Sequence, residues 1–158
     1  MVLLIYIGAW LLKTPAEERV TLGFNCVKTE PTEQETAVIP SEPAGETCET
    51  GEFLKADTPE TRTQGLSGRA SSADTPGMVF VFDDDQPHEI WMKDMQFPLH
   101  LIWLDSDFKV VDIAYDVAPE TYPKTFTSAK PARYLIELDT SFASKDELPF
   151  KIGDQVYY

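Results

Sequence analysis

The sequence predicts an all-β domain with a minor helical part: a compact β-sandwich or closed β-barrel with one or two short helices. From about Gly51 onward, short apolar or alternating runs are separated by turn residues, which is typical of an all-β domain. The chain has 158 residues, of which 42% are hydrophobic. Roughly 100 residues of this composition can bury a hydrophobic core without the help of disulfides or bound metals. We therefore place the β domain at residues 52–158.

The N-terminal part, residues 1–27, is predicted to be a signal or membrane-anchor segment with its flank. No charged residue lies between Val2 and Leu12. This run is shorter than the roughly 20 residues of a membrane-spanning helix. Its length suits the core of a signal peptide, although a basic leader and a small-x-small cleavage site are missing. The alternative is a hydrophobic strand or helix of the soluble fold. We expect the chain to be anchored or exported, and extracytoplasmic, rather than cytoplasmic.

Residues 28–51 are rich in proline, glutamate and threonine. Such a segment cannot bury enough surface to offset the entropy of ordering it, so we expect a flexible tether. Cys26 precedes this segment and Cys48 lies within it, and neither belongs to a CxxC motif or a Cys/His cluster. A metal site or a dithiol redox motif is therefore not indicated. The two cysteines either form a disulfide in an oxidising compartment or remain unrelated thiols.

Within the domain the elements are predicted in order. FLKA, residues 53–56, is a first strand, and DTPETRTQGLSG is a short helix capped by Asp57 or Thr58, with Pro59 in its first turn. The later elements are strands at residues 78–82, 89–93, 99–104, 109–117 and 132–138, a short helix or turn near 140–148, and a closing strand near 154–158.

Alternation assigns the faces of two of these strands. The apolar face of KVVDIAYDV is expected to consist of Val111, Ile113, Tyr115 and Val117. In ARYLIEL, Arg133 and Glu137 are expected on the polar face, about 13 Å apart at the rise of a strand. Since they are too far apart to pair with each other, each is expected to meet a partner on a neighbouring strand.

Four segments carry a family resemblance. DTPETRTQGLSGR, GMVFVF, IWMKDMQFPLHLIWLD and ARYLIEL occur in this order and together resemble the bacterial and archaeal family called domain of unknown function 192, over roughly residues 52–158. The resemblance implies a compact, mostly β domain, often exported or membrane-tethered, with no established activity. Two positions depart from the family pattern: Ser67 replaces the methionine of a GLM segment, and His100 replaces the aspartate of a PLDI segment. If the family uses that carboxylate, its role is altered here.

The candidate ligand-binding residues are Arg69, Trp91, Lys93 and His100. Trp91 and Lys93 share a strand face, so a cation lies against an aromatic wall, which suits an anionic or sugar-acid ligand. The alternative for Lys93 is a lysine that extends from an edge strand into water. His100 is either a hydrogen-bonded core residue or a proton-transfer group. Arg69 either clamps a carboxylate of a ligand or pins a loop.

Charge and missing motifs narrow the function further. Acidic residues number 27 against 13 basic ones, for a formal charge of −14. This balance argues against a nucleic-acid partner and against binding to anionic membrane surfaces, so we expect contact with a membrane only through the N-terminal segment. The histidines have no metal-ligand spacing, and motifs for a catalytic nucleophile or a phosphate loop are absent from the sequence. We expect no cofactor and no metal.

Three functional hypotheses remain. The preferred one is a tethered extracytoplasmic binding or accessory module, with no established activity, for a small ligand or an envelope protein. The second is a hydrolase- or lyase-type enzyme that uses Arg69, Lys93 and His100 in a shared cavity; convergence of these side chains would favour it and dispersal would count against it. The third is an envelope interaction module without a small-molecule site, which an exposed apolar patch would favour.

Overall fold

The computed structural model describes residues 17–28, 46–72 and 74–158. Residues 1–16 of the expected signal or anchor segment, and most of the expected tether, lie outside this part of the chain. No helix within it is both long enough and apolar enough to cross a membrane.

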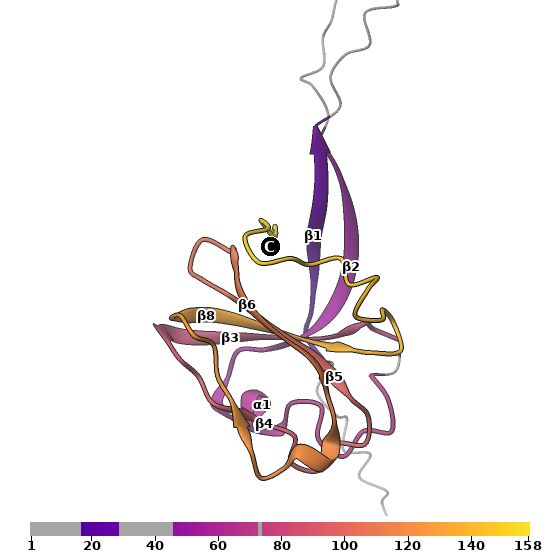
Figure 1. The fold of residues 1–158 in the computed structure, drawn as a ribbon, viewed down its shortest axis with the longest axis vertical. Helices are drawn as coiled ribbons and strands as arrows, with labels where there is room; N and C mark the ends of the chain where they lie inside the picture. The colour runs from indigo at the N-terminus through magenta and orange to yellow at the C-terminus, as the bar shows by residue number, and fades with distance from the viewer. Residues whose placement is uncertain (1–16, 29–45, 73) are drawn as a thin grey trace, which may run out of the picture.

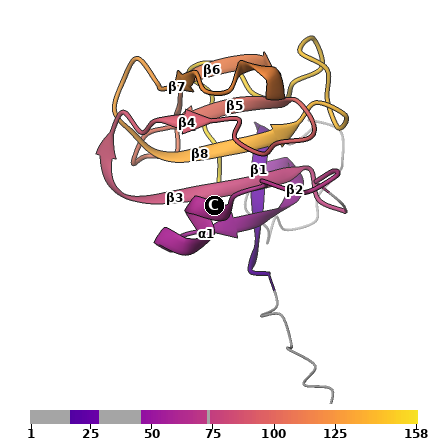
Figure 2. The same ribbon diagram turned by 90° about the horizontal axis from the view of Figure 1, so that it is seen from below.

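A six-stranded sheet forms the body of the molecule (Figures 1 and 2). Its order is β1-β2-β3-β8-β5-β6. Strands β2 and β3 are parallel, and the other neighbours are antiparallel. The strands are β1 (Arg19–Lys28), β2 (Glu46–Ala56), β3 (Gly77–Gln86), β5 (Leu99–Leu104), β6 (Val110–Val117) and β8 (Ala132–Asp139).

Both faces of this sheet are covered. The smaller elements are α1 (Pro59–Gln64), the 3-10 helix η1 (Pro119–Thr121), and a ribbon of β4 (Ile90–Trp91) with β7 (Thr125–Phe126). Helix α1 and the β4–β7 ribbon lie on one side of the sheet, and the chain after β8 lies on the other (Figure 1). Because β5 is buried on both faces, its sequence LHLIWL is almost continuously apolar.

Two hydrophobic clusters correspond to these faces. The cluster on the α1 side contains Leu66, Phe80, Met92, Leu101, Trp103 and Leu135 among others. The cluster on the opposite side contains Leu22, Phe53, Ile102, Ile136, Phe150 and Val156 among others. Residues far apart in sequence therefore share each core, and the prediction of an all-β domain with one or two short helices is confirmed.

The C-terminal segment links the two edges of the sheet. The predicted closing strand near residues 154–158 forms two isolated β-bridges. Gln155 pairs with Lys109, which precedes β6, and Tyr157 pairs with Gly23 of β1. The amide of Tyr157 donates to the carbonyl of Gly23 over 2.8 Å, and the amide of Gly23 donates back over 2.8 Å. The sheet is thus not a closed barrel, but both of its outer strands are covered by the same short segment.

Helix α1 follows its sequence signals closely. Of the two predicted caps, Thr58 is the one used, because its hydroxyl accepts a hydrogen bond from the Thr61 amide over 3.2 Å. Pro59 occupies the first turn, where its missing amide hydrogen costs nothing. Gly65 ends the helix with a φ of 49°, a conformation that glycine adopts without strain.

The sheet begins earlier in the chain than the predicted domain start at residue 52. Strand β1 and the first residues of β2 belong to it, and Cys26 and Cys48 form a disulfide between them with their Cα atoms 4.1 Å apart. Leu22 and Phe53 are buried on the inner face of this hairpin, while its outer face is polar. Because the outer face is polar, the composition of this region does not reveal the strands. Residues 46–51, which were expected to belong to the tether at residues 28–51, are part of β2.

Bulges overturn the predicted faces of β6. Trp103 lies opposite Asp112 and Leu104 lies opposite Val110, so Val111 is an extra residue on β6. An inserted residue reverses the side to which the following side chains point. Val111 therefore packs with the cluster on the α1 side, and Ile113 packs with the opposite one. The prediction that these two residues share a face is wrong.

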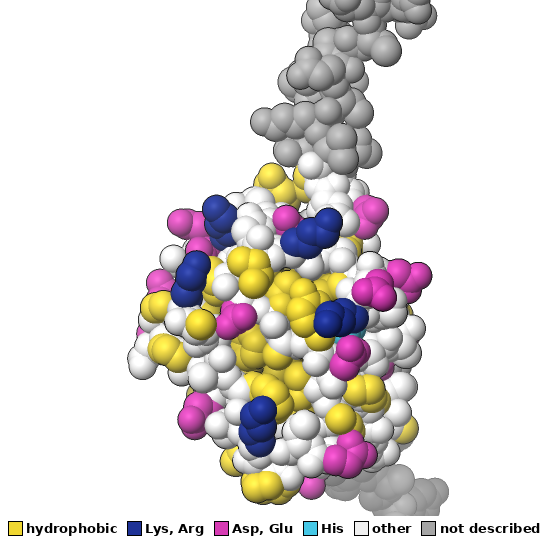
Figure 3. All heavy atoms as spheres, in the orientation of Figure 1, with side chains coloured by type: hydrophobic (Ala, Val, Ile, Leu, Met, Phe, Trp, Pro, Cys, Tyr) yellow, Lys and Arg dark blue, Asp and Glu magenta, His cyan; other side chains and the backbone are white. Residues whose placement is uncertain are grey.

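Figure 3 shows the surface in the orientation of Figure 1, where hydrophobic side chains gather across the middle of the face among separate acidic and basic groups. Among the described residues, the large hydrophobic side chains that are exposed are Trp91, Tyr115, Tyr122, Phe142, Ile152, Tyr157 and Tyr158. The protein thus presents aromatic surface in addition to its acidic groups.

Candidate functional site

Glu137 is a buried carboxyl group without a partner. It lies in the middle of β8, opposite Met78 of β3 and Leu101 of β5. Its side chain is on the α1 side of the sheet, the side that Leu135 also faces. Only 6% of the residue is exposed, and its Oε2 atom has no hydrogen-bond partner among the described residues. For Glu137 the prediction of a cross-strand partner on a polar face is therefore wrong, whereas Arg133 does lie 3.8 Å from Asp85 of β3.

Burial changes the ionisation of this group. Desolvation disfavours the charged carboxylate and raises the pKa of Glu137 from the ordinary 4.5 to about 8. At neutral pH the carboxyl group is therefore mainly protonated. The only other buried side-chain polar atom without a partner in the described part of the chain is Nε1 of Trp103. Since Trp103 lies opposite Leu135, both unpartnered groups belong to the same face of the sheet.

Glu137 lines a small cavity of about 80 Å³. Its walls come from α1 and the turn after it, from Phe80 of β3, and from the chain between residues 89 and 95. The lining residues are Arg62, Thr63, Gln64, Gly65, Leu66, Ser67, Phe80, Glu89, Ile90, Trp91, Met95 and Glu137. All four of the segments that carry the family resemblance therefore contribute residues to the candidate site.

The turn after α1 is what holds this cavity in shape. Gly65 reverses the chain so closely over β3 that an added Cβ would lie 3.2 Å from the Phe80 ring. Leu66 then enters the core. The hydroxyl of Ser67 donates to the backbone carbonyl of Lys93 over 2.8 Å, which ties the turn to the segment after β4.

A wider depression of about 420 Å³ adjoins the cavity and shares Arg62, Phe80 and Glu89 with it. Asp83 and Asp84 also line it. The depression therefore carries three carboxylates, one arginine and His88, which come from α1, the end of β3 and the chain before β4.

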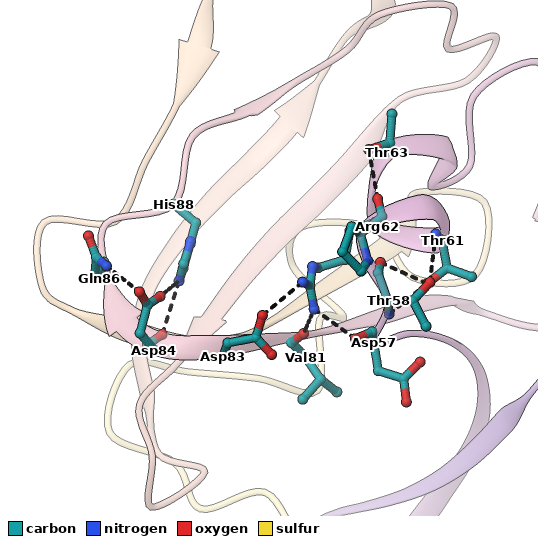
Figure 4. A network of polar contacts seen from close by, with 11 residues as sticks. Asp57, Thr58, Thr61, Arg62, Thr63, Val81, Asp83, Asp84, Gln86 and His88 are labelled. Atoms are coloured by element: carbon teal, nitrogen blue, oxygen red, sulfur yellow. Dashed lines mark hydrogen bonds and ion pairs between the residues drawn. The ribbon is translucent and has the colours of Figure 1, made fainter.

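The charge of Arg62 is already engaged (Figure 4). Its Nη1 donates to the carbonyls of Asp57 and Val81 over 2.8 and 2.7 Å, and its Nη2 donates to Oδ2 of Asp83 over 3.0 Å. Nearby, the His88 ring lies over the ring of Phe82, with centroids 3.7 Å apart. Arg62 thus fastens α1 to β3 and has little donor capacity left for a ligand.

Trp91 lies at the rim of the cavity, with Lys93 beside it. Trp91 is 53% exposed, and its ring meets Tyr122 edge-on at a centroid distance of 6.0 Å. The Nζ atom of Lys93 lies 5.9 Å from the centroid of the Trp91 ring. Trp91 lines the Glu137 cavity, whereas the side chain of Lys93 points over the exposed ring.

Arg69 belongs to a different and larger cavity of about 290 Å³, which Lys55 also lines. Both cations there are paired within the chain: Arg69 with Glu17, and Lys55 with Glu18 at 2.7 Å and Asp57 at 3.0 Å. Its size alone would favour this cavity as a ligand site. We favour the smaller cavity because its buried acid lacks a partner, whereas both cations of the larger one are already paired.

His100 lies on the opposite face of the sheet and is fully buried at 0% exposure. Its Nδ1 accepts a hydrogen bond from the Asp116 amide over 3.2 Å, and its Nε2 lies 3.1 Å from the Ala143 carbonyl. This pattern requires the neutral ring with a proton on Nε2. The structure therefore places His100 as a link between a bulge of β6 and the chain after β8, and it does not bring His100, Lys93 and Arg69 into one cavity.

Replacing His100 by alanine is expected to destabilise the fold by about 2 to 3 kcal/mol, since it leaves a cavity and two backbone groups without partners. Urea unfolding of the variant and the wild type measures this loss. A loss under about 0.5 kcal/mol would contradict the structural role. The Glu137 cavity is expected to be unaffected, because the imidazole lies on the other side of the sheet.

No group of three or more His, Cys, Asp or Glu side chains within the described residues is arranged to hold a metal ion. The acidic side chains around the depression are therefore separate charges rather than a ligand set.

A family model with the description "uncharacterized ACR", DUF192, matches residues 41–158. The chain belongs to the DUF192 family. The matched range includes all of strand β2, which begins before residue 52, and every element that forms the Glu137 cavity. Of the two departures from the family pattern, Ser67 lines that cavity and His100 does not.

Two solved structures are similar to this DUF192 chain. A "putative transcription regulator" from Sinorhizobium meliloti 1021 has 22% sequence identity and a TM-score of 0.67, with 89% of this chain and 94% of that chain covered. A protein of unknown function from Novosphingobium aromaticivorans DSM 12444 has 26% identity and a TM-score of 0.60, with 69% and 77% covered. The first likeness shows the fold alone. No curated protein matches the chain.

Proposed function

We propose that this DUF192 protein is a tethered extracytoplasmic binding module that holds one end of a small ligand in the cavity at Glu137. The observation that carries the proposal is the unpartnered Oε2 of a buried carboxyl group that lines a cavity. A buried polar group without a hydrogen bond costs roughly 1 to 3 kcal/mol. Native folds rarely retain such a cost without a functional reason, and perturbed titratable groups cluster at functional sites.

Binding is a better account of this cavity than catalysis. Its charged or titratable lining residues are Glu137, Glu89 and Arg62, and the guanidinium of Arg62 is engaged with Asp83 and two carbonyls. The hydroxyl groups of its lining residues Ser67 and Thr63 already donate to the carbonyls of Lys93 and Pro59. A nucleophile next to a general base, which an acyl or glycosyl transfer would need, is not present among these lining residues.

Two features support the extracytoplasmic location. The run from Val2 to Leu12 has the length and polarity of a signal-peptide core. The Cys26–Cys48 disulfide is of a kind that persists in oxidising compartments. The formal charge of −14 opposes binding to the phosphate backbone of a nucleic acid. We therefore do not propose a role in transcription for this chain.

A thermal-shift screen of the full chain tests the proposal. The panel contains sugars, sugar acids, alkylammonium salts, small anions and divalent metal chlorides. A ligand at 100 times its Kd adds about 2.7 kcal/mol of stability, which raises the unfolding midpoint by several degrees. At least one compound is expected to do so for the wild type. If none does, the binding function is contradicted.

Two variants locate the effect. Glu137→Leu removes the carboxyl group, and Ser67→Met narrows the cavity with the residue of the family's GLM segment; both are expected to abolish the midpoint shift. Glu120→Gln, an exposed change outside the cavity, is the matched control and should keep it. A compound that shifts Glu137→Leu as much as the wild type would place the site elsewhere, for example in the cavity of Lys55 and Arg69.

A further inference from the structure

We infer that the ligand of this site is a cation, a primary ammonium group on a short alkyl stem, which binds against the Glu137 carboxylate and drives a proton from that carboxyl into solvent. This inference rests on the proposed function and names the chemical class of its ligand. The proton balance is simple: the ammonium group keeps its own protons, and the carboxylic acid of Glu137 becomes the carboxylate that pairs with it.

The charges around the cavity favour a cation. The charged side chains that line it with Glu137 are Arg62 from α1 and Glu89 from the chain before β4; β3 and the turn after α1 contribute uncharged residues. The adjoining depression adds Asp83, Asp84 and His88, whose Nε2 lies 3.4 Å from Oδ1 of Asp84. Arg62 is already paired with Asp83 at 3.0 Å, and Glu89 and Asp84 outnumber Lys93, whose Nζ lies over the Trp91 ring, so an excess of negative charge remains. An anionic ligand would meet repulsion from these groups.

The size and the walls of the cavity fit the same ligand. A volume of about 80 Å³ admits two or three molecules of water size, at roughly 30 Å³ each, and so admits an ammonium group with one or two methylenes. Phe80 and Trp91 form aromatic walls, which attract cations through the faces of their rings. Lys93, whose Nζ lies 5.9 Å from the Trp91 centroid, shows that a cation can lie over this ring.

The remaining stem of the ligand has a place to lie. The depression of about 420 Å³ extends from the cavity over Phe82 and Ile90, so apolar surface continues outward from the buried end. The tip of a lysine side chain, a polyamine or an alkylamine has this chemistry in common: a terminal ammonium on a methylene chain. The shared group, carried by a simple alkylammonium ion, is therefore the right first probe.

The proton exchange gives the inference a measurable signature. Burial holds the pKa of Glu137 at about 8, whereas an alkylammonium stays charged to roughly pH 10. Only the ionised form of Glu137 binds the cation with full affinity. The affinity is therefore expected to rise about tenfold between pH 7 and pH 9 through proton linkage, and at pH 7 binding should release close to one proton.

Isothermal titration of the full chain with n-butylammonium chloride tests the inference, with n-butanol as the neutral probe and butyrate as the anion. Titrations at pH 7 in two buffers of different ionisation enthalpy count the protons released. Butylammonium is expected to bind more tightly than either other probe, and about tenfold more tightly at pH 9 than at pH 7. Glu137→Gln, which keeps the shape but cannot ionise, should lose this binding, and Glu120→Gln should retain it. Two further probes are titrated in the same way: Nα-acetyl-lysine amide, which represents a lysine side chain, and putrescine, which represents a free amine. Their relative affinities distinguish these two sources of the ammonium group.

The outcomes separate the ligand class from the binding function. Tighter binding of butanol or butyrate, or an affinity that does not change with pH, overturns the cationic ligand while a binding site at Glu137 still stands. Undiminished binding to Glu137→Gln also overturns it. If no compound of the thermal-shift panel binds and butylammonium does not bind either, the inference and the proposed function fail together. The unfolding midpoint of Glu137→Gln, expected at or above that of the wild type, verifies that this variant folds.

Discussion

The free energy of unfolding of the wild-type chain is expected to fall as the pH rises from 5 to 8.5, by several kcal/mol in total. Glu137 has a pKa of about 8 in the fold and about 4.5 when unfolded. Between these values the native state binds more protons than the unfolded state, and so stability decreases with pH at roughly 1 kcal/mol per unit. The contribution is complete below pH 4.5 and is lost as the pH passes through 8.

Other perturbed carboxyl groups act outside this window. Burial opposes ionisation of Asp139, but hydrogen bonds from Ser141 and Ser72 outweigh it and lower its pKa. The pKa of Asp74 is lowered by its hydrogen bond from Arg19. Stability from these two groups is present above the pKa of an unfolded aspartate, near 4, and is lost as the pH falls further. They add no downward slope between pH 5 and 8.5.

Urea unfolding at several pH values measures the effect, and Glu137→Gln isolates it. The variant cannot ionise, so the difference between wild type and variant should remove every other titrating group from the comparison. The stability of the variant relative to that of the wild type is expected to increase steadily from about pH 5, and the variant should be clearly more stable at pH 8.5. Parallel stability curves for the two proteins would show that Glu137 is not a buried, unpartnered acid.

The second large effect is expected from the Cys26–Cys48 disulfide. The bond closes a loop with a sequence separation of 22, and in the chain-entropy account a loop of this length is worth about 3 kcal/mol. The double variant Cys26→Ala, Cys48→Ala is therefore expected to lose about that much stability. The weakened strand is β1, which also pairs with Tyr157 of the C-terminal segment, so the loss extends to both ends of the described chain.

Urea unfolding with and without dithiothreitol tests this prediction. Reduction should lower the stability of the wild type to that of the double variant, and it should leave the double variant unchanged. A wild type that is insensitive to the reductant, or a double variant as stable as the oxidised wild type, would contradict it. Ligand binding at Glu137 should survive in the double variant, because the disulfide hairpin does not line that cavity.

Local signals predicted the elements whose physics is local. The cap at Thr58, the proline that follows it and Gly65 define α1 within a few residues, and LHLIWL is strand β5 from end to end. In the first hairpin only the end of β2, residues 53–56, was predicted; β1 and the start of β2 escaped prediction because their outer face is polar and only alternate residues such as Leu22 enter the core. The faces of β6 were wrong because a bulge leaves no mark in the apolar pattern.

The candidate site was only partly visible in the sequence. Trp91 was identified, and it lies at the rim of the cavity. Glu137 was missed because Ile136 and Leu138 suggested a strand with one face exposed to solvent. The signal that both faces are buried was Leu135, an apolar residue on the face that was expected to be polar. Arg69 and His100 lie apart from Lys93. Their positions depend on which side of the sheet each segment crosses, and the pattern of apolar residues does not determine the side.

The most direct test is a residue-specific titration of Glu137. The carboxyl ¹³C resonance of this residue, assigned by its absence from the spectrum of Glu137→Gln, can be followed between pH 4 and pH 10. A midpoint near 8 in the free protein, which moves lower when n-butylammonium is added, is the predicted result. A midpoint near the ordinary 4.5 would mean that the carboxyl group is solvated or paired, and that Glu137 forms no ligand site of this kind.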